Sequence, residues 1–559
     1  MLSSNVKQSS KFCKCYCCLN PIISFPSSLD YQNSGNVNSS TFHYDFATAT
    51  TSSLYPHTQF TNSESLPSLP ESFRSFTRSF PQYLTTVEAD QIRANDYRHL
   101  YLSSHVCLDY SGHALFTFSQ QQQQQQSGEF IASSSSNSHH KTQRVSSIEI
   151  SHKANESLSL EFEDKLRRRI MRYLNVSEDD YSMFFTANQT SAFGLLAESY
   201  PFQTNKNLIT VYDHENEAVE TMVKCSKNKG ARALAAEFKW PKLKIYREKL
   251  EEMVLGSFRK KKQNKGLFVF PVQSRVSGAR YSYQWMNLAR EYGWHVLLDA
   301  SALHPKEMDT LGLSLFQPDF IVCTFYKVFG EDPSGFSCLL VKKSISPILN
   351  HSYISTSPGN MSVTKNDQGE FNECDVECKG LDQADALGLV LIGNRVRCVI
   401  NWLTNALLAL YHPHSERGTQ LVQVYGPRVK FERGSSLAFN VFDWKGDRVD
   451  PMLVQKLADR SNISLGCGLL KHVWFSERYE VEREKIMVKE PKEGRKKCKG
   501  KKKERSESGI SVVTANIGYL SNFEDVYMVW NFVSKFLDAD FVEKERWRYT
   551  ALNQKSIEV

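Results

Sequence analysis

Two side chains that could do chemistry follow two apolar segments of this chain. Asp299 comes directly after the apolar run 295–298, and Lys327 lies four residues beyond the run 320–323. The neighbours of Lys327 are aromatic and apolar, so burial would lower the pKa of its amine and free it to form a Schiff base. The plain alternatives are a solvated surface lysine and a helix-capping aspartate.

A carboxylate, a lysine and an anion site in this chain predict a pyridoxal 5'-phosphate (PLP) site. Asp299 would be the fixed anion that keeps the pyridine nitrogen of the cofactor protonated. Thr324, three residues before Lys327, is well placed to bind a phosphate oxygen. The polar segment 186–191 lies between an apolar run and a helical pattern, where a helix N-terminus can bind an anion, although a turn explains it as well. A dinucleotide site is disfavoured because no Gly-x-Gly-x-x-Gly follows an apolar run.

Short apolar runs alternate with helical patterns through the middle of the chain. The runs are 183–185, 208–212, 267–270, 295–298 and 320–323, and the helical patterns are 158–174, 191–198, 217–224 and 283–292. Nearly continuous apolar strands separated by helices are typical of a parallel sheet covered on both faces. Ligands of such sheets bind at the carboxyl ends of the strands, where the residues above would gather.

The chain divides into a large and a small domain, with segments of low complexity around them. A mainly parallel α/β domain is predicted over 83–434, and a smaller C-terminal α+β domain over 435–559 from a strand at 437–441 and helices at 450–460 and 524–536. The Ser/Thr-rich segment 1–82, the glutamine- and serine-rich insert at about 119–140 and the basic insert at about 487–508 are predicted to be disordered. The first segment holds a cluster of cysteines, Cys13, Cys15, Cys17 and Cys18, for which metal binding is the alternative to a flexible, thiol-rich tail.

The bulk composition excludes several classes of protein. The 559 residues are 41% hydrophobic and 23% charged, and no stretch approaches the ~20 continuous apolar residues of a membrane helix. The net charge of +7 comes largely from one lysine tract at 495–503, without a reading helix or base-stacking motif, so nucleic acid is an unlikely partner. Most of the cysteines stand singly in apolar runs, which indicates a reducing, intracellular compartment. The cytoplasm is favoured, and an organelle (plastid or mitochondrion) or the nucleus is the alternative.

The residues around these positions resemble the amino-terminal sulfurase part of molybdenum cofactor sulfurases and, more distantly, the cysteine desulfurases. The resemblance runs from about Tyr83 to Phe541. It is carried by the segments 106–112, 185–190, 270–274, 297–300, 325–327 and 517–519, and the block around Lys327 with Gly335 is the most specific. It implies the PLP-dependent transferase fold type I of the class V aminotransferases and a homodimer with the active site near the subunit interface. The reaction it implies takes sulfur from L-cysteine onto an enzyme cysteine as a persulfide.

The resemblance also implies a role for each matching residue. Lys327 would hold the cofactor as a Schiff base, and Asp299 would pair with the pyridine nitrogen. The phosphate would be held by Gln189, Thr190 and Thr324. Gln273, in the matched segment 270–274, is a further cofactor-binding candidate.

Three positions depart from the family pattern. Where the family stacks a histidine on the cofactor ring, this chain has Asn216, with His214 two residues before it. The family's cofactor-facing asparagine is replaced by Arg275, a bulky cation. Read without gaps, the position of the persulfide cysteine holds Leu469, and Cys467 lies two residues earlier. Cys467 remains the candidate nucleophile if a mobile loop presents it to the substrate. Otherwise it is an ordinary loop thiol without a catalytic role.

These observations support three hypotheses for function. The first is a PLP enzyme that takes sulfur from L-cysteine. The second is another PLP reaction, such as a lyase or elimination, which needs no enzyme thiol. The third is a binding protein that has kept the fold without its chemistry, although such a protein has no physical need for both Lys327 and Asp299.

Overall fold

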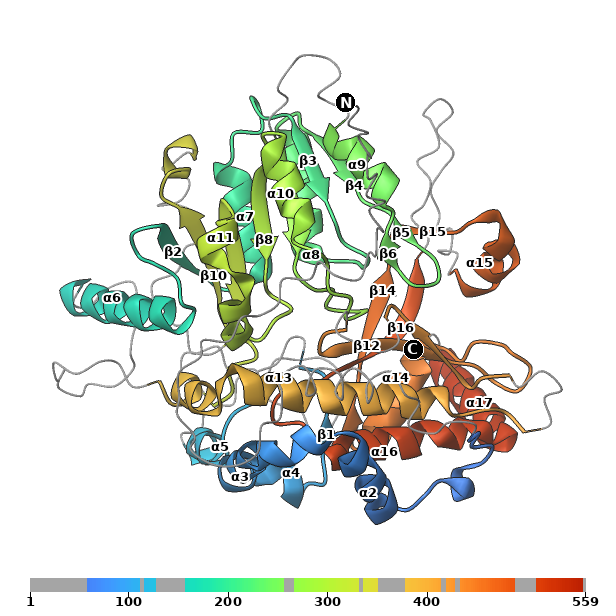
Figure 1. The fold of residues 1–559 in the computed structure, drawn as a ribbon. Helices are drawn as coiled ribbons and strands as arrows, with labels where there is room; N and C mark the ends of the chain where they lie inside the picture. Colours follow the sequence, from blue (N-terminus) through green and yellow to red (C-terminus); the bar gives the residue numbers. More distant parts are fainter. Residues whose placement is uncertain are drawn as a thin grey trace, which may run out of the picture.

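The computed structural model of the chain describes residues 58–110, 115–126, 156–255, 266–330, 335–349, 378–413, 419–427, 433–487 and 509–555. The cysteine cluster near the N-terminus and the lysine tract of the basic insert lie outside these residues. Two lobes are visible in Figure 1, with a seven-stranded sheet in the upper lobe and a four-stranded sheet in the lower one.

The large sheet has the strand order β2-β10-β9-β8-β7-β3-β4. Its strands are β2 (Tyr181–Thr186), β3 (Asn207–Thr210), β4 (Arg232–Ala235), β7 (Gly266–Pro271), β8 (His295–Asp299), β9 (Phe320–Thr324) and β10 (Ser337–Lys342). The neighbours from β9 to β4 pair in parallel, and β10 pairs antiparallel with both β9 and β2. All five predicted apolar runs are strands of this sheet, so the predicted mainly parallel sheet is confirmed.

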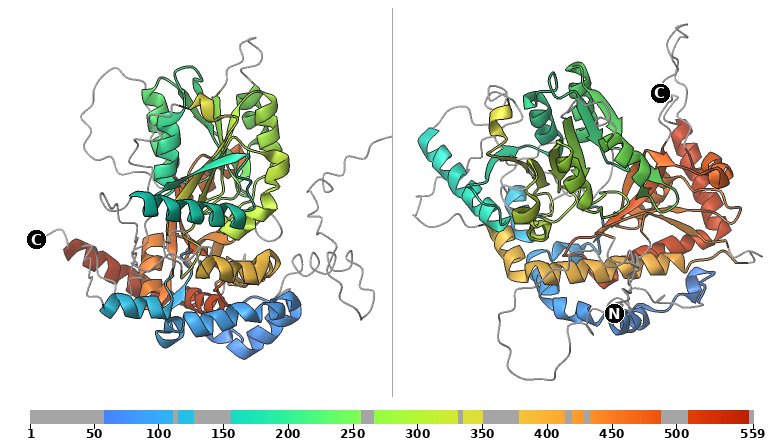
Figure 2. Two further views of the ribbon diagram at one scale, coloured as in Figure 1. Left: turned by 90° about the vertical axis from the view of Figure 1, so that its left-hand side faces the viewer. Right: turned by 45° about the horizontal axis from the view of Figure 1, so that its top comes forward.

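Both faces of the large sheet are buried, which explains its nearly continuous apolar strands. Along β9, Phe320 and Val322 belong to the core beneath the helices α7 and α8, whereas Ile321 and Cys323 belong to the core on the opposite face. That opposite core includes residues of α6 and α10. Figure 2 shows helices on both sides of the sheet. The helices are α6 (Glu156–Tyr173), α7 (Gln189–Ser199), α8 (Glu217–Asn228) and α10 (Gln284–Glu291). Because each strand is packed on both faces, its residues do not alternate between apolar and polar along the chain.

The small lobe is an antiparallel sheet in the order β11-β12-β16-β14, covered by helices. Its main elements are β11 (Val422–Tyr425), β12 (Ser436–Val441), α14 (Pro451–Arg460), β14 (Gly466–Leu470), β16 (Ile510–Asn516) and α16 (Phe523–Ser534). The predicted strand and both predicted helices are confirmed by β12, α14 and α16. The other α-helices and strands are α3 (Val87–Asp96), α4 (His99–Leu102), β1 (Val106–Cys107), β5 (Phe238–Lys239), β6 (Lys244–Ile245), α9 (Arg247–Leu255), α11 (Leu313–Phe316), β13 (Ile463–Ser464), β15 (Val473–Trp474), α15 (Glu480–Ile486) and α17 (Ala539–Lys555).

The long helix α13 (Lys379–Leu408) lies between the two lobes in Figure 1. By length and composition alone it is apolar enough to span a membrane, but half of its most apolar stretch is buried within the protein. Its Trp402 and Leu403 are fully buried in the core of the small lobe. Part of the apolar surface of this helix is therefore covered by its own chain.

Two predicted disordered segments contain ordered structure. Residues Leu69–Ser79, predicted to be disordered, form helix α2, whose Phe76 stacks on Phe523 of α16 with ring centroids 4.6 Å apart. The glutamine run is also helical, as the end of α5 (Phe118–Gln126). The first prediction failed because the core that buries the apolar side of α2 comes from the far end of the chain, which local composition does not reveal. The glutamine run shows that low complexity does not by itself exclude a helix.

Candidate active site at the carboxyl edge of the large sheet

Asp299, at the end of β8, is a buried carboxylate that accepts hydrogen bonds from several elements. Its Oδ2 accepts hydrogen bonds from Gln189 Nε2 and from the Tyr212 hydroxyl, both at 2.7 Å, and its Oδ1 accepts from the backbone N–H of Ser301 at 2.9 Å. The residue is only 4% exposed. These bonds join α7, the end of β3 and β8 around one carboxylate, and burial and bonding together hold it in place.

Lys327 lies in the turn that follows β9, and its amine is buried. The Nζ atom donates a hydrogen bond to the carbonyl of Ala302 at 2.5 Å. Burial lowers the pKa of this amine to about 8, while the carboxylate of Glu307 acts in the opposite direction and the charge of Arg275 lowers the pKa further. An amine with such a pKa is in part neutral near physiological pH, as Schiff-base formation requires.

The turn that holds Lys327 is fixed on both sides. Thr324 donates to the carbonyl of Ser301 at 3.2 Å, and the Tyr326 hydroxyl donates to the carbonyl of Ala187 at 3.1 Å. Gly335 has a positive φ of 74° at the start of the return into β10, and a Cβ there would lie 3.2 Å from the Tyr326 ring. The glycine noted in the sequence therefore suits a left-handed backbone that packs against Tyr326.

The predicted phosphate residues lie at the first turn of α7 and at the end of β9. Asn188 caps α7, because its side chain accepts from the backbone N–H of Ser191 at 2.8 Å. Thr190 follows at the first turn, where N–H groups and the helix dipole favour an anion. The side-chain amide of Gln189 donates to Asp299, and the phosphate contact that the resemblance implies for this residue stays a prediction. In the structure, the Gln189 side chain binds the Asp299 carboxylate.

The two candidates for the ring-facing position have different environments. Asn216 caps α8, since its side-chain oxygen accepts from the backbone N–H groups of Ala218 and Val219 at 2.9 and 3.4 Å. That oxygen is therefore already used within the helix. His214 is buried and its Nδ1 lies 2.8 Å from Asp213, whereas its Nε2 has no hydrogen-bond partner. The carboxylate orients the ring and leaves Nε2 as a proton acceptor, so His214 suits a role in the site better than Asn216 does.

Serines and an arginine of the segment 273–279 complete this side of the site. Ser274 and Ser277 both donate to the Asp213 carboxylate, at 2.6 and 2.5 Å. Gln273 is buried, and its Oε1 accepts from Arg280 at 3.0 Å while its Nε2 has no partner. Arg275 lies close enough to Lys327 for its positive charge to lower the pKa of the amine. The arginine that replaces the family's asparagine at position 275 therefore places a positive charge within electrostatic range of Lys327.

Cys467 lies in a strand, so the mobile loop that would have to present it as a nucleophile is not present at this position. This strand is β14, in which Cys467 pairs with Val513 of β16, and its thiol contacts the Pro451 carbonyl and Gln455 Oε1 of α14 at 3.7 and 3.4 Å. Cys467 is exposed as a residue, but desolvation of its thiol against α14 and the nearby carboxylates, Asp450 first, raise the pKa of the thiol to about 12. A thiol with this pKa is a poor nucleophile near neutral pH.

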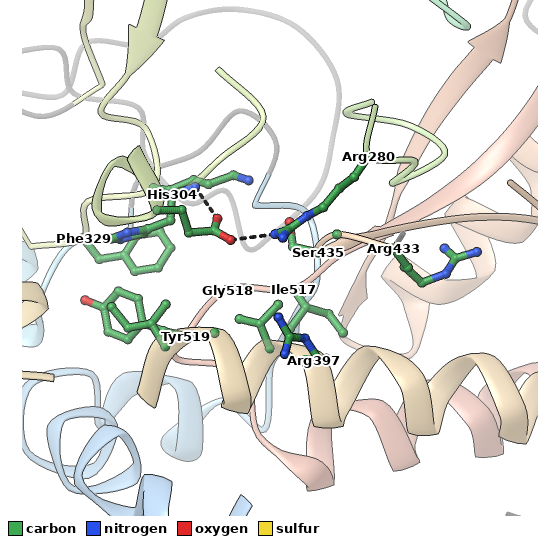
Figure 3. A pocket seen from close by; sticks show the side chains of 15 residues that line it. Arg280, His304, Phe329, Arg397, Arg433, Ser435, Ile517, Gly518 and Tyr519 are labelled. Atoms are coloured by element: carbon green, nitrogen blue, oxygen red, sulfur yellow. Dashed lines mark hydrogen bonds and ion pairs between the residues drawn. The ribbon is translucent and has the colours of Figure 1, made fainter. Parts of the chain in front are cut away.

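A cavity that opens to solvent lies beside Lys327 (Figure 3), and the empty space there is about 550 Å³ when the adjoining open solvent is included. Residues of both lobes and of α13 line it, among them Arg280, His304, Glu307, Arg397, Arg433 and Tyr519. Cys467 and Leu469 are not among its lining residues. Sequence reasoning missed this set because its members come from separate parts of the chain. Tyr212 was also missed, although the rule that found Asp299 applies to it, since it ends the apolar run 208–212.

The residues at the sheet edge fit PLP. The buried carboxylate Asp299 can keep a pyridine nitrogen protonated, the N-terminus of α7 can receive a phosphate, and Lys327 has a lowered pKa. Among the residues that the structure describes, the buried Nε2 atoms of His214 and Gln273 have no hydrogen-bond partner. Unpaired buried polar atoms of this kind are expected where a ligand binds.

Comparison with curated proteins finds similarity to molybdenum cofactor sulfurases. The chain is 24% identical over 501 residues to the molybdenum cofactor sulfurase of Solanum lycopersicum, which covers 81% of this chain and 58% of that protein. It is 25% identical over 421 residues to the Homo sapiens protein of the same name, with coverages of 68% and 46%. The chain therefore spans about half the length of the curated relatives it matches. No protein-family model matches the chain.

Solved structures share the fold. The apo structure of a cysteine desulfurase from Thermococcus onnurineus NA1 matches with a TM-score of 0.52 at 13% identity, over 80% of this chain and 98% of that one. At this identity the likeness concerns the fold alone, which is PLP-dependent transferase fold type I. Fold, site and relatives agree: the chain is similar to molybdenum cofactor sulfurases, has the fold of PLP-dependent transferases and has a site whose residues fit PLP.

Proposed function

We propose that this protein uses PLP at Lys327 to remove sulfur from L-cysteine. The observation that carries the proposal is the buried Lys327 amine, with a pKa of about 8, at the same sheet edge as the buried carboxylate Asp299. The relatives named molybdenum cofactor sulfurase support sulfur chemistry. PLP supplies an electron-accepting ring that makes bonds to the α-carbon of an amino acid easier to break.

Each residue of the site has a task in this proposal. Lys327 attaches the cofactor and, once released, can carry a proton at Nζ. Asp299 stays fixed by Gln189 and Tyr212, so its charge needs no rearrangement during the reaction. His214 can accept a proton at Nε2 because Asp213 holds its other ring nitrogen.

The position of Cys467 favours a second candidate, an elimination that needs no enzyme thiol. Transfer to a thiol would give alanine and a persulfide, whereas elimination with water would give pyruvate, ammonia and hydrogen sulfide. The thiol of Cys467 packs on α14 and its pKa is raised to about 12. Within the described residues, Cys467 therefore has neither the position nor the ionisation of a sulfur acceptor. A small thiol from solution could take that role in the first reaction.

The first experiment is a visible absorption spectrum of the purified protein supplied with PLP, beside that of Lys327→Ala. The band of the lysine-bound cofactor should be present in the wild type and missing in the variant. Absence of the band from both proteins would refute the proposal and leave a binding protein that kept the fold.

The second experiment separates the two reactions. L-cysteine is supplied with and without a small thiol such as dithiothreitol, and alanine, pyruvate and sulfide are measured. Alanine formation that depends on the added thiol and survives Cys467→Ala would support sulfur transfer without an enzyme persulfide. Pyruvate with sulfide would support elimination, and loss of turnover in Cys467→Ala would restore the persulfide route.

A further inference from the structure

The backbone just after Lys327 is held by a segment from far upstream in the chain. Gly330, three residues after the lysine, donates its N–H to the carbonyl of Leu115 at 2.7 Å. The Gly330 carbonyl accepts a hydrogen bond from Gln120 Nε2 at 3.2 Å, across 210 residues of sequence. Both backbone polar groups of Gly330 are therefore bonded by the segment 115–120.

Gly330 also packs directly against this upstream segment. Its φ is 66°, and a Cβ there would lie 2.7 Å from the methyl carbon of Thr117 and 2.7 Å from the Tyr97 hydroxyl. Only glycine suits a left-handed backbone that approaches its neighbours so closely. The turn of Lys327 therefore ends at a residue that is held by two hydrogen bonds and by direct contact.

The side-chain amide of Gln120 is oriented by Thr117 at the first turn of α5. Its Oε1 accepts hydrogen bonds from the backbone N–H of Thr117 at 2.8 Å and from the Thr117 hydroxyl at 3.1 Å. The backbone N–H of Gln120 in turn lies 3.4 Å from the Thr117 hydroxyl oxygen, which completes the reciprocal bonding of a capping box. Because a backbone N–H can bond only the oxygen of a side-chain amide, Nε2 is the end of the amide that faces Gly330.

Gln120 is the first of seven consecutive glutamines, and its neighbours fix its place in the run. The ring of Phe118 lies under the Arg98 guanidinium, 4.0 Å from the ring centroid, and stacks with the His99 ring at a centroid distance of 6.4 Å. The start of α5 is thus anchored on the helices before it. The glutamine three residues after Thr117 is therefore the one whose amide reaches the turn of the lysine.

We propose that Gln120 is a positioning residue for Lys327, because its amide fixes the end of the turn from which the lysine amine reaches the cavity. The inference rests on the proposed function in so far as Lys327 is the lysine that holds PLP. Phe329 lies between the lysine and Gly330 in the chain, is fully buried, and packs on Tyr519 with ring centroids 5.5 Å apart (Figure 3). Lys327 and Phe329 both line the cavity. Since close-packed side chains transmit displacements, a shift of Gly330 is passed on to the lysine.

Hydrogen exchange of the cofactor-free protein tests the contact without PLP. Gln120→Glu keeps the oxygen that caps α5 and loses the N–H groups that bond Gly330, whereas Gln120→Met loses both without adding a charge. Amide exchange over residues 328–330 should become about 3- to 10-fold faster in both variants, the scale of one hydrogen bond. Gln122→Glu is the matched control, because Gln122 is exposed, and it should exchange like the wild type. Unchanged exchange in both Gln120 variants would overturn the proposal.

Cofactor attachment tests the consequence for the lysine. A loosened turn admits water to the Lys327 amine and weakens the burial that lowers its pKa. The pH midpoint of PLP attachment, followed by absorbance, should therefore rise in both Gln120 variants and stay unchanged in Gln122→Glu. A rise in Gln120→Glu alone would be an effect of the added charge and would overturn the proposal. Faster exchange in the variants of a wild type that never binds PLP would refute the proposed function alone.

The length of the glutamine run gives an independent check. Deleting two of the seven glutamines still leaves a glutamine directly after Thr117, Phe118 and Ser119, so position 120 keeps its amide. The shortened protein should have the exchange rate and the pH midpoint of the wild type. A change as large as that of Gln120→Met would mean that the site depends on the length of the run and not on this one amide, and would overturn the proposal.

Discussion

Replacing Lys327 by methionine should make the cofactor-free protein more stable below pH 8. Methionine has nearly the length of lysine and no charge, so it keeps the packing and removes the buried amine. The ordinary pKa of 10.5 falls to about 8 in the folded protein, chiefly by burial. At about 1.4 kcal/mol per pH unit, this difference corresponds to about 3 kcal/mol of destabilisation by the charged amine.

The gain is reduced by the hydrogen bond that methionine cannot make. The bond from Nζ to the Ala302 carbonyl contributes about 1 kcal/mol, so the net stabilisation at pH 7 should be about 2 kcal/mol. Its pH dependence follows from proton binding. Between pH 8 and 10.5 the unfolded lysine binds a proton that the folded one has released, so the wild type gains stability as the pH rises. The advantage of the variant should shrink across this window.

Urea unfolding of both proteins without PLP, at pH 7, 8, 9 and 10, measures this difference. Lys306→Met is the control, because the Lys306 amine lies 2.9 Å from Asp385 and 3.0 Å from Asp309 and its loss should destabilise the protein. A wild type as stable as Lys327→Met at pH 7, with a constant difference up to pH 10, would refute the reasoning. In that case the amine would be solvated and would not be poised for a Schiff base.

Three further substitutions and one control, Gly293→Ala, test the site and the backbone that supports it. Asp299→Asn keeps the side-chain shape and removes its charge, so the variant should retain the absorption of bound PLP and lose turnover by ~100-fold or more, the scale of losing one charge-stabilising group. Arg275→Asn removes a charge that lowers the pKa of the lysine amine, so the pH midpoint of cofactor attachment, followed by absorbance, should rise; an unchanged midpoint would show that this charge does not reach the amine. Gly278→Ala forces a side chain onto a φ of 70° with its Cβ 2.1 Å from the Ser436 carbonyl oxygen, and should lower the free energy of unfolding by about 2 kcal/mol or more. Gly293→Ala, at a φ of 79° with open space around it, should cost only about 1 kcal/mol in the same urea assay.

The fold of the large lobe could be predicted because its signal is local. Strands buried on both faces must be apolar along their length, and β7 and β9 show this in a few consecutive residues. Their order along the chain, with helices between them, leaves a parallel sheet as the natural arrangement. Because ligands bind at the carboxyl ends of such strands, Asp299 and Lys327 could be chosen as site residues before any contact was known.

Contacts between distant parts of the chain could not be predicted in this way. Helix α2 is ordered because it packs against α16, near the other end of the chain. The thiol of Cys467 points at α14 because β14 pairs with β16, whereas the family pattern alone suggested a loop. In both cases the local sequence lacks the partner that fixes the conformation.

By itself, the sequence determined the α/β class, the position of the strands and the two residues, Lys327 and Asp299, that mark a PLP site. The apolar pattern of a strand and the residue types at its end can both be recognised from residues that are neighbours in the sequence. Only the tertiary structure decided that the Gln189 amide donates to Asp299, and that among the described residues Nε and Nη2 of Arg433 have no hydrogen-bond partner. The physical reason is that burial and pairing depend on residues brought together from far along the chain, and those residues set the pKa and the partners of every charged group in the site.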